Sequence, residues 1–227
     1  MIRAVAFDLD GTLVDSRRDL VAAVNRTRVE AGFVPLSDQE VVAKIGHGAR
    51  DLVRKSLPEV VSGERFEHAF RRFGEIYLEV CLDETRPYPG IPELLNALRH
   101  RGLPLAVVTN KPERPTRKIL VGLELEGSFT VVLGGDSLPV RKPDPLPLNE
   151  AARRLGVEPT ALALVGDSAV DAATAEAAGA CFVQVTWGFG VAAELARYRP
   201  WLVAASAGDI AAALAPTSVR EDGRSSS

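Results

Sequence analysis

Short apolar runs that alternate with helical segments constrain the fold of this chain more than any other sequence feature. Near-continuous hydrophobicity is typical of strands that are buried on both faces of a parallel sheet. Six such runs are present: Ile2–Phe7, Leu105–Val108, Phe129–Leu133, Ala161–Val165, Cys181–Val185 and Trp201–Ala204. Helical patterns lie between them and are followed by glycine, which readily takes the left-handed conformation at a helix end: Pro92–Arg101, Pro145–Leu155 and Ala169–Ala178. The alternation predicts an α/β fold with a doubly wound, Rossmann-like parallel sheet.

Between the first and second runs the alternation stops, and only amphipathic helical patterns follow one another. Ser16-x-x-Asp19 and Ser37-x-x-Glu40 each predict a capping box at the start of a helix. A long helix around Glu64–Leu82 carries aromatic residues at helical spacing that we expect in a core: Phe66, Phe70, Phe73 and Tyr77. We therefore predict an α/β core at residues 1–15 and 87–215, an inserted helical cap at residues 16–86, and a disordered tail at residues 216–227.

Length, charge and cysteine usage exclude several classes of protein. A chain of 227 residues can bury a core without disulfides, so Cys81 and Cys181 are expected to be free thiols in a reducing cytoplasm. The net charge of −3 argues against nucleic-acid binding. The absence of a basic leader and of a long apolar stretch argues against export or a membrane partner. Monomer and dimer both stay open.

Two carboxylates end the first predicted strand, in the stretch Phe7–Thr12, at Asp8 and Asp10. Alternation along a strand would point both to the same side, where they need a cation, a shared proton or a lysine. Polar residues also follow the later strands, at Thr109 and Asp167, with Lys142 in the loop after the third strand. The carboxyl ends of parallel strands share one crevice, so we expect these residues to meet there.

The chemistry of this set favours phosphoryl transfer. Three carboxylates, those of Asp8, Asp10 and Asp167, suit Mg2+, which takes carboxylates, waters and phosphate oxygens as ligands. With the cation present, a phosphate could approach Asp8 as a carboxylate nucleophile. Lys142 and the hydroxyl of Thr109 would stabilise the transferring phosphoryl oxygens, and the amides of the Gly11 turn could add donors.

Four ordered motifs resemble those of the haloacid-dehalogenase superfamily of phosphohydrolases: Asp8–Thr12, Thr109–Lys111, Arg141–Pro145 and Gly166–Asp171. The helical insertion resembles the C1 cap of that superfamily. The resemblance implies that Asp8 is the nucleophile and Asp10 the general acid and base. It also implies a phosphate clamp of Thr109 and Lys142, a metal site of Asp8, the Asp10 backbone carbonyl and Asp167, and a role for Asp171 in holding metal-bound water or orienting Lys142.

Further segments resemble the phosphoglycolate phosphatase subfamily: Ile45–Val53, Thr109–Arg114 and Gly134–Pro139. This resemblance implies a Mg2+-dependent phosphomonoester hydrolase that forms an aspartyl phosphate and acts on a small phosphorylated metabolite, 2-phosphoglycolate. The carboxylate of that substrate would meet backbone amides at Gly46 and Gly48, with His47 or Arg50 supplying charge. We also predict that Gly11, Thr12 and Asn110 bind substrate.

Several alternatives remain open at this level. Phosphatases for sugar phosphates such as N-acetylmuramic acid 6-phosphate share much of the pattern, and a sugar phosphomutase would share the aspartyl phosphate. A phosphonate hydrolase would need a cap lysine, for which Lys44 or Lys55 could be proposed. A dehalogenase is excluded because such enzymes lack the second aspartate that stands here at Asp10. A phosphoacceptor signalling module is disfavoured because Asp8 ends the first strand rather than the third.

Overall fold

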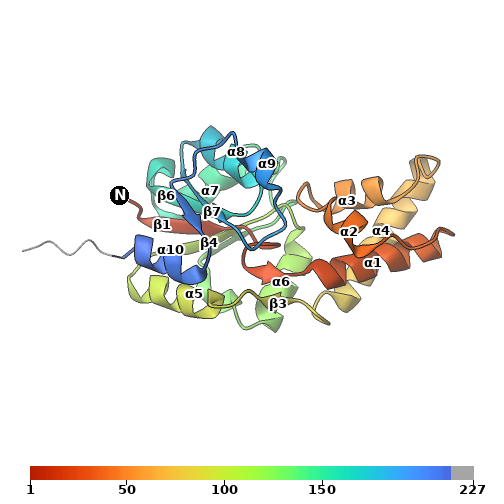
Figure 1. Ribbon diagram of the computed structural model, residues 1–227, viewed down its shortest axis with the longest axis horizontal. Helices are drawn as coiled ribbons and strands as arrows, with labels where there is room; N and C mark the ends of the chain where they lie inside the picture. The colour runs from red at the N-terminus through yellow and green to blue at the C-terminus, as the bar shows by residue number, and fades with distance from the viewer. Residues whose placement is uncertain (216–227) are drawn as a thin grey trace, which may run out of the picture.

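The computed structural model describes residues 1–215 and contains a six-stranded parallel sheet (Figure 1). From edge to edge the strands are β5 (Val131–Leu133), β4 (Leu105–Val108), β1 (Ala4–Phe7), β6 (Leu162–Gly166), β7 (Cys181–Val185) and β8 (Leu202–Ala204). In the centre, Phe7 pairs with Val107 on one side and Val165 on the other. The predicted doubly wound α/β fold is confirmed. The predicted tail at residues 216–227 lies outside the described part of the chain.

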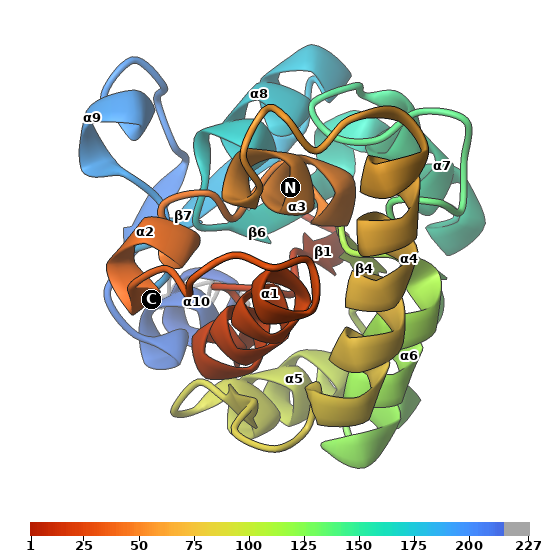
Figure 2. The same cartoon turned by 90° about the vertical axis from the view of Figure 1, so that its right-hand side faces the viewer.

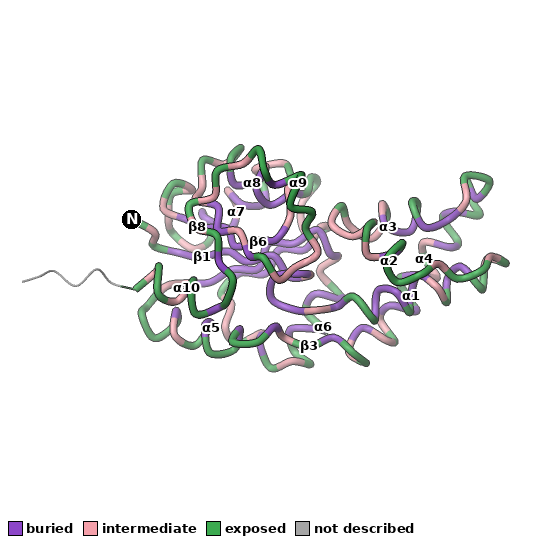
Figure 3. The backbone as a smooth tube through the Cα atoms, in the orientation of Figure 1, coloured by how far each residue is buried: buried purple, intermediate pink, exposed green. Residues whose placement is uncertain are grey.

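Helices cover both faces of the sheet because each central strand is apolar on both sides. Val5 and Phe7 of β1 belong to one buried cluster, together with side chains of α5 (Ile91–His100), α6 (Glu113–Gly122) and α10 (Ala207–Ala213). Ala4 and Ala6 belong to a second cluster on the other face, with α7 (Leu146–Leu155) and α8 (Ala169–Ala178). The strands form the buried centre of the molecule (Figure 3).

Four predicted strands begin later than the apolar runs that suggested them, and the first of these, β1, begins at Ala4 rather than Ile2. Phe129 follows the short 3-10 helix η1 (Glu126–Ser128), and Ala161 ends a second one, η2 (Pro159–Ala161). Trp201 is half exposed and precedes β8. These runs include residues of the connection before the strand: Phe129 packs against the core, and the Trp201 N–H donates to the Phe182 carbonyl of β7.

Four helices occupy the insertion between β1 and α5, and they lie together beyond the carboxyl end of the sheet (Figures 1 and 2). They are α1 (Arg17–Glu30), α2 (Asp38–Val42), α3 (Ala49–Ser56) and α4 (Gly63–Val80). Two chain segments connect them to the sheet, and these pair as the short antiparallel strands β2 (Val14–Asp15) and β3 (Arg86–Pro87). The helices therefore extend from a double-stranded connection.

One of the two capping boxes predicted in this insertion is wrong. At Ser37 the box is present, with Glu40 as its partner. The Ser16 side chain makes no capping bond to α1 and instead donates a hydrogen bond of 2.5 Å to Asp10. Asp19 accepts hydrogen bonds from the backbone of Glu84 and Thr85 and from the Thr85 hydroxyl. Ser16 and Asp19 therefore bond to other segments of the chain instead of to each other's backbone.

The aromatic stripe of α4 is only partly core. Phe66, Phe73 and Tyr77 are buried, but Phe70 is partly exposed. Phe70, Phe73 and Tyr77 also line the cavity described below, so this helix faces both the insertion's own core and the space above the sheet. Among the described residues, no helix has the length and apolarity needed to cross a bilayer.

Candidate active site

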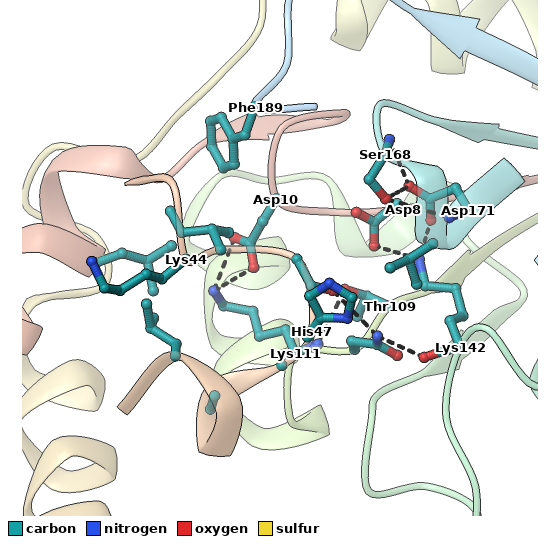
Figure 4. Close-up of a pocket in the computed structure, with 18 of the residues that line it drawn as sticks. Asp8, Asp10, Lys44, His47, Thr109, Lys111, Lys142, Ser168, Asp171 and Phe189 are labelled. Atoms are coloured by element: carbon teal, nitrogen blue, oxygen red, sulfur yellow. Dashed lines mark hydrogen bonds and ion pairs between the residues drawn. The ribbon is translucent and has the colours of Figure 1, made fainter. Parts of the chain in front are cut away.

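A cavity of about 1060 Å³ lies between the helical insertion and the carboxyl ends of the strands. Its floor carries Asp8, which follows β1, and Thr109, which follows β4 (Figure 4). Asp167, which follows β6, lines the same cavity. Lys142 reaches the same floor from the loop between β5 and α7. Residues far apart in sequence meet here because parallel strands end at one edge of the sheet.

Lys142 holds two carboxylates together at the floor. Its Nζ lies 2.8 Å from Oδ1 of Asp8 and 2.5 Å from Oδ1 of Asp171. Burial opposes the positive charge, but Asp171 and Asp8 outweigh that effect and raise the pKa of Lys142. Burial raises the pKa of Asp8 to about 6 against the opposing charge of Lys142, and Asp171 adds to the rise. Asp171 also forms a capping box with Ser168 at the start of α8.

Asp10 has a separate lysine, which the sequence analysis did not single out. The Nζ of Lys111 lies 2.9 Å from both carboxylate oxygens of Asp10, and the lysine side chain is only 3% exposed. The two aspartates that follow β1 are therefore each neutralised by a different lysine. The only sequence signal for Lys111 was its place just after a strand end, inside the motif that supplied Thr109.

Asp167 is enclosed by two chain segments, Gly11–Thr12 and Gly188–Gly190. Its Oδ2 accepts N–H bonds from Phe189 and Gly190, at 2.6 and 3.0 Å, and its Oδ1 accepts the Thr12 hydroxyl at 3.3 Å. A Cβ on Gly11 would come within 2.5 Å of the same carboxylate, so glycine is required there. Burial, followed by the charges of Asp171 and Asp8, raises the pKa of Asp167 to about 7. The Gly188–Gly190 turn was missed, although its glycine spacing directly after β7 was visible.

An acidic cluster at this floor can hold a metal ion. Oxygen atoms of Asp8, Asp167 and Asp171 all lie within 4.8 Å of one another, and all three residues are buried. Buried carboxylates this close together raise one another's pKa, so a cation fits them electrostatically. The Asp10 carboxylate is outside this cluster and is bound to Lys111 instead.

Three other predicted site residues, Thr109, Asn110 and His47, line the cavity. Thr109 is buried at the floor, and its hydroxyl accepts the Lys111 N–H. Asn110 donates hydrogen bonds to the carbonyls of Gly46 and Lys142, at 3.3 and 3.0 Å, and so joins the insertion to the sheet. His47 lines the cavity from the loop before α3.

Arg50 does not reach the cavity. It forms an exposed ion pair with Glu67 and packs its guanidinium against the rings of Phe66 and Phe70. Arg50 is also absent from the residues that line the cavity. The structure therefore does not bring Arg50 to the site, although its place in the glycine-rich segment Ile45–Val53 suggested it.

Together, the strand-end carboxylates and their paired lysines below a helical insertion define an enzyme of the doubly wound α/β class with carboxylates at the centre of its site. Comparison with known sequences places the chain further: residues 5–185 match the haloacid dehalogenase-like hydrolase family. The chain belongs to this family, and the resemblance inferred from its motifs is confirmed.

Curated relatives of the chain are named for one member of this family, phosphoglycolate phosphatase. Phosphoglycolate phosphatase from Chromobacterium violaceum is 41% identical over 86% of this chain and 89% of its own. Phosphoglycolate phosphatase from Nitrosospira multiformis is 42% identical over 83% and 85%. Among solved structures, a predicted phosphoglycolate phosphatase from Haemophilus somnus 129PT superposes with a TM-score of 0.86 and 33% identity, covering 92% of this chain and 96% of that one. The prediction of a phosphatase of this family is confirmed.

Proposed function

We propose that this enzyme hydrolyses 2-phosphoglycolate through an aspartyl phosphate on Asp8, with Mg2+ as its cofactor. One observation supports the assignment of Asp8 as the nucleophile above all others. Asp8 lies on the cavity floor, belongs to the acidic cluster and forms an ion pair with the buried Lys142. The substrate is supported by the names of relatives that are 38–43% identical over most of this chain.

Asp8 is the residue we assign to in-line attack on phosphorus. Its Oδ1 is bound to Lys142, so the second carboxylate oxygen is the one we assign to attack. The Lys142 ammonium and the Thr109 hydroxyl lie at the same floor and would donate to the phosphoryl oxygens as negative charge shifts toward them. Asp171 positions Lys142 by its short hydrogen bond.

Asp10 is our candidate for general acid and base. It lies two residues beyond Asp8 and lines the same cavity, and its orientation is fixed by Lys111 and by the Ser16 hydroxyl. In the first step it would protonate the leaving alkoxide, and in the second it would take a proton from the water that hydrolyses the aspartyl phosphate. Because Asp10 is held in the same cavity as Asp8, one carboxyl group can serve as the acid of the first step and the base of the second.

The donor set fits Mg2+ because it consists of hard carboxylate oxygens beside a cavity that admits water and a phosphate. Asp8 and Asp167 would hold the ion, with the Asp10 backbone carbonyl as a further ligand and Asp171 alongside. When bound, Mg2+ offsets the clustered negative charge and polarises the phosphoryl group. The enclosure of Asp167 by Thr12 and the Gly188–Gly190 turn keeps that ligand in place.

We further propose that residues 16–86 act as a cap over the site. The Asn110 bond to the Gly46 carbonyl joins the loop before α3 to the cavity floor. Contact of this kind would exclude bulk water during transfer and would limit the substrates that fit. Both cysteines are free, which supports our placing the enzyme in a reducing cytoplasm.

A second substrate class is favoured by one observation. The cavity of about 1060 Å³ is far larger than a two-carbon acid requires. Phosphates of amino sugars, such as N-acetylmuramic acid 6-phosphate, would use more of this space. A sugar phosphomutase would also fit the volume, and its product would retain phosphate.

A phosphate-release screen separates these candidates. We expect wild-type enzyme with Mg2+ to release phosphate from 2-phosphoglycolate with a higher kcat/KM than from amino-sugar phosphates or simple alkyl phosphates. EDTA should abolish turnover, and Asp8→Asn, checked for deamidation by mass spectrometry, should be inactive. A strong preference for an amino-sugar phosphate would overturn the substrate, phosphate retained in an isomeric product would indicate a mutase, and activity in EDTA would overturn the metal dependence.

A further inference from the structure

We propose that Lys111 and Tyr77 form the subsite that binds the carboxylate of the substrate. This inference rests on the proposed function, because it concerns the end of the substrate that is not transferred. It moves carboxylate recognition away from the glycine-rich loop at residues 46–50 and places it between the sheet and α4.

The length of the substrate selects Lys111. In 2-phosphoglycolate, a single methylene carbon separates the leaving-group oxygen from the carboxylate. If Asp10 protonates that oxygen, the carboxylate must lie next to Asp10. Among the ion pairs of the described residues, Lys111 is the cation that contacts Asp10, at 2.9 Å from both oxygens. Because its side chain is almost fully buried, its charge is poorly screened and acts strongly over short distances.

Tyr77 supplies an independent observation. Its side chain, on the last turns of α4, is 3% exposed and lines the cavity, and its hydroxyl has no hydrogen-bond partner in the described part of the chain. Its ring lies 4.4 Å from the Lys111 Nζ. A buried hydroxyl without a partner is costly, so its retention beside a buried ammonium points to a ligand that accepts a hydrogen bond. Burial raises the pKa of Tyr77 well above its usual value, so the phenol stays a donor.

The two donors complement a carboxylate. A carboxylate offers two oxygens, of which one can accept from the ammonium and the other from the phenol. The ring of Tyr77 also holds the Lys111 ammonium by a cation–π contact. The lysine is therefore fixed by Tyr77 on one side and by Asp10 on the other. A methyl group in the place of the carboxylate would leave the Tyr77 hydroxyl without an acceptor, and Lys111 would pair with Asp10 alone.

Five other cations of the cavity wall fit this role less well because none of them forms an ion pair with Asp10: Lys44, Lys55, Arg71, Arg114 and Arg197. The first three are also engaged elsewhere. Lys44 donates to the Glu40 carbonyl, and Lys55 pairs with Asp51. Arg71 contacts the ring nitrogen of His68. All three belong to the helical insertion, and none contacts Asp10.

The test compares 2-phosphoglycolate with ethyl phosphate, which replaces the carboxylate by a methyl group. For each variant the ratio of the two kcat/KM values is measured, so that any loss through Asp10 that both substrates share cancels. Tyr77→Phe should lower the ratio about tenfold and Lys111→Gln about thirtyfold, mainly through the KM for 2-phosphoglycolate. Lys111→Arg should restore part of the ratio.

Two variants serve as matched controls. Tyr88→Phe removes another buried hydroxyl that lacks a partner among the described residues but lies outside the cavity lining. Lys44→Gln removes a cation from the cavity wall. Both should keep the wild-type ratio within about twofold, and Tyr77→Phe should unfold thermally at or above the wild-type temperature, because the hydroxyl it removes is unsatisfied.

The possible outcomes distinguish failure of the carboxylate subsite from failure of the proposed substrate. A wild type that prefers 2-phosphoglycolate strongly, with Tyr77→Phe and Lys111→Gln retaining that preference, would overturn the subsite alone. Equal losses on both substrates in Lys111→Gln, with no effect of Tyr77→Phe, would show that Lys111 only positions Asp10. A wild type with no preference for 2-phosphoglycolate would overturn the proposed substrate and the subsite with it.

Discussion

The Nζ atom of Lys142 lies 2.8 Å from Oδ1 of Asp8, and this ion pair is almost entirely removed from solvent. Asp171 holds the same ammonium from its other side. One positive charge thus compensates two buried carboxylates, and a third, Asp167, lies close by. The floor of the cavity retains an excess of negative charge, which ties its stability to a bound cation and to pH.

Removing Lys142 should cost both activity and stability. In Lys142→Met, Asp8 and Asp171 would stay buried without their cation, and breaking a buried pair in this way costs about 3–5 kcal/mol. We expect a loss of stability of that order in EDTA, a smaller loss with Mg2+, and a fall in kcat of about a thousandfold or more. Urea unfolding and phosphate release measure the two effects.

Arg153→Met is the matched control for this variant. Arg153 forms an ion pair with Glu150 on the surface of α7, where its side chain is 71% exposed. Such pairs contribute about 0–1 kcal/mol, so stability and kcat should both stay near wild type. A Lys142→Met protein as stable as this control would contradict the structural role of Lys142.

Much of the sheet could be predicted because its strands are buried on both faces. Each of the six apolar runs overlaps a strand of the observed sheet, and the helix at Ala169–Ala178 has the predicted ends. The helices α6 and α10 were not predicted. Neither helix is followed by a glycine of the kind that marked the other helices, since α6 has Gly122 as its own last residue and Leu214 follows α10. The start of α10 did carry a local signal, a capping box of Ser206 and Asp209, which was overlooked.

Mg2+ binding should weaken as the pH falls. Burial raises the pKa of Asp8 to about 6 and that of Asp167 to about 7, from an ordinary value of 3.8. A carboxyl whose pKa is raised in the fold stabilises the protein at low pH, and that stability is lost as the pH rises through the folded pKa. In EDTA, stability should therefore fall between about pH 4 and pH 7 from these two groups.

The cation should reverse that trend. At about pH 8 both carboxylates are ionised and bind it directly, whereas at about pH 5.5 it must displace protons. The rise in melting temperature caused by Mg2+ should be clearly larger at the higher pH, and Asp167→Asn should remove most of this difference. An equal rise at both pH values would contradict the assignment of these carboxylates as ligands.

Gly48 should be required for the contact between the loop before α3 and the floor. Its φ is +91°, and a Cβ there would lie 3.1 Å from the Asn110 carbonyl oxygen. Gly48→Ala should therefore displace the loop and lower kcat/KM about tenfold, with a loss of stability of about 1 kcal/mol. Steady-state kinetics and thermal unfolding measure these changes.

Gly32→Ala isolates the backbone effect in that comparison. Gly32 has nearly the same φ, +87°, but its Cβ would meet no atom within 4 Å. It should lose similar stability and keep wild-type kinetics. If both variants were equally active, the loop contact at Gly48 would have no part in turnover.

The site was less predictable than the sheet because its contacts join distant segments. Asp8, Asp167 and Lys142 were identified from strand ends, a rule that needs only topology. Lys111 and the Phe189 and Gly190 amides were missed, since their partners lie about 100 and 22–23 residues away and no local pattern pairs them. The motifs picked out the residues that we propose to react, and Asp171 beside Lys142, but not the contacts that hold Asp10 and Asp167.

Asp19 illustrates the same limit and gives a final prediction. The pattern Ser16-x-x-Asp19 is typical of a capping box, yet Asp19 is 2% exposed and binds the segment that returns from α4 to the sheet. One of its oxygens accepts the Glu84 N–H at 2.9 Å, and the other accepts the N–H and hydroxyl of Thr85, at 2.9 and 2.6 Å. Both carboxylate oxygens of Asp19 are therefore needed as acceptors for the return segment.

Asp19→Asn should therefore destabilise this connection although it is nearly isosteric. An amide has one acceptor oxygen, so its NH2 group would face a backbone donor, and a buried donor left unsatisfied costs about 1–3 kcal/mol. We expect a loss of that size in urea unfolding and faster proteolytic cleavage between Asp83 and Pro87. Asp38→Asn, at the exposed start of α2, should change stability by no more than about 0.5 kcal/mol. If the two variants unfolded at the same urea concentration, Asp19 would not secure the return segment, and the Ser16 and Asp19 pattern would again need a local explanation.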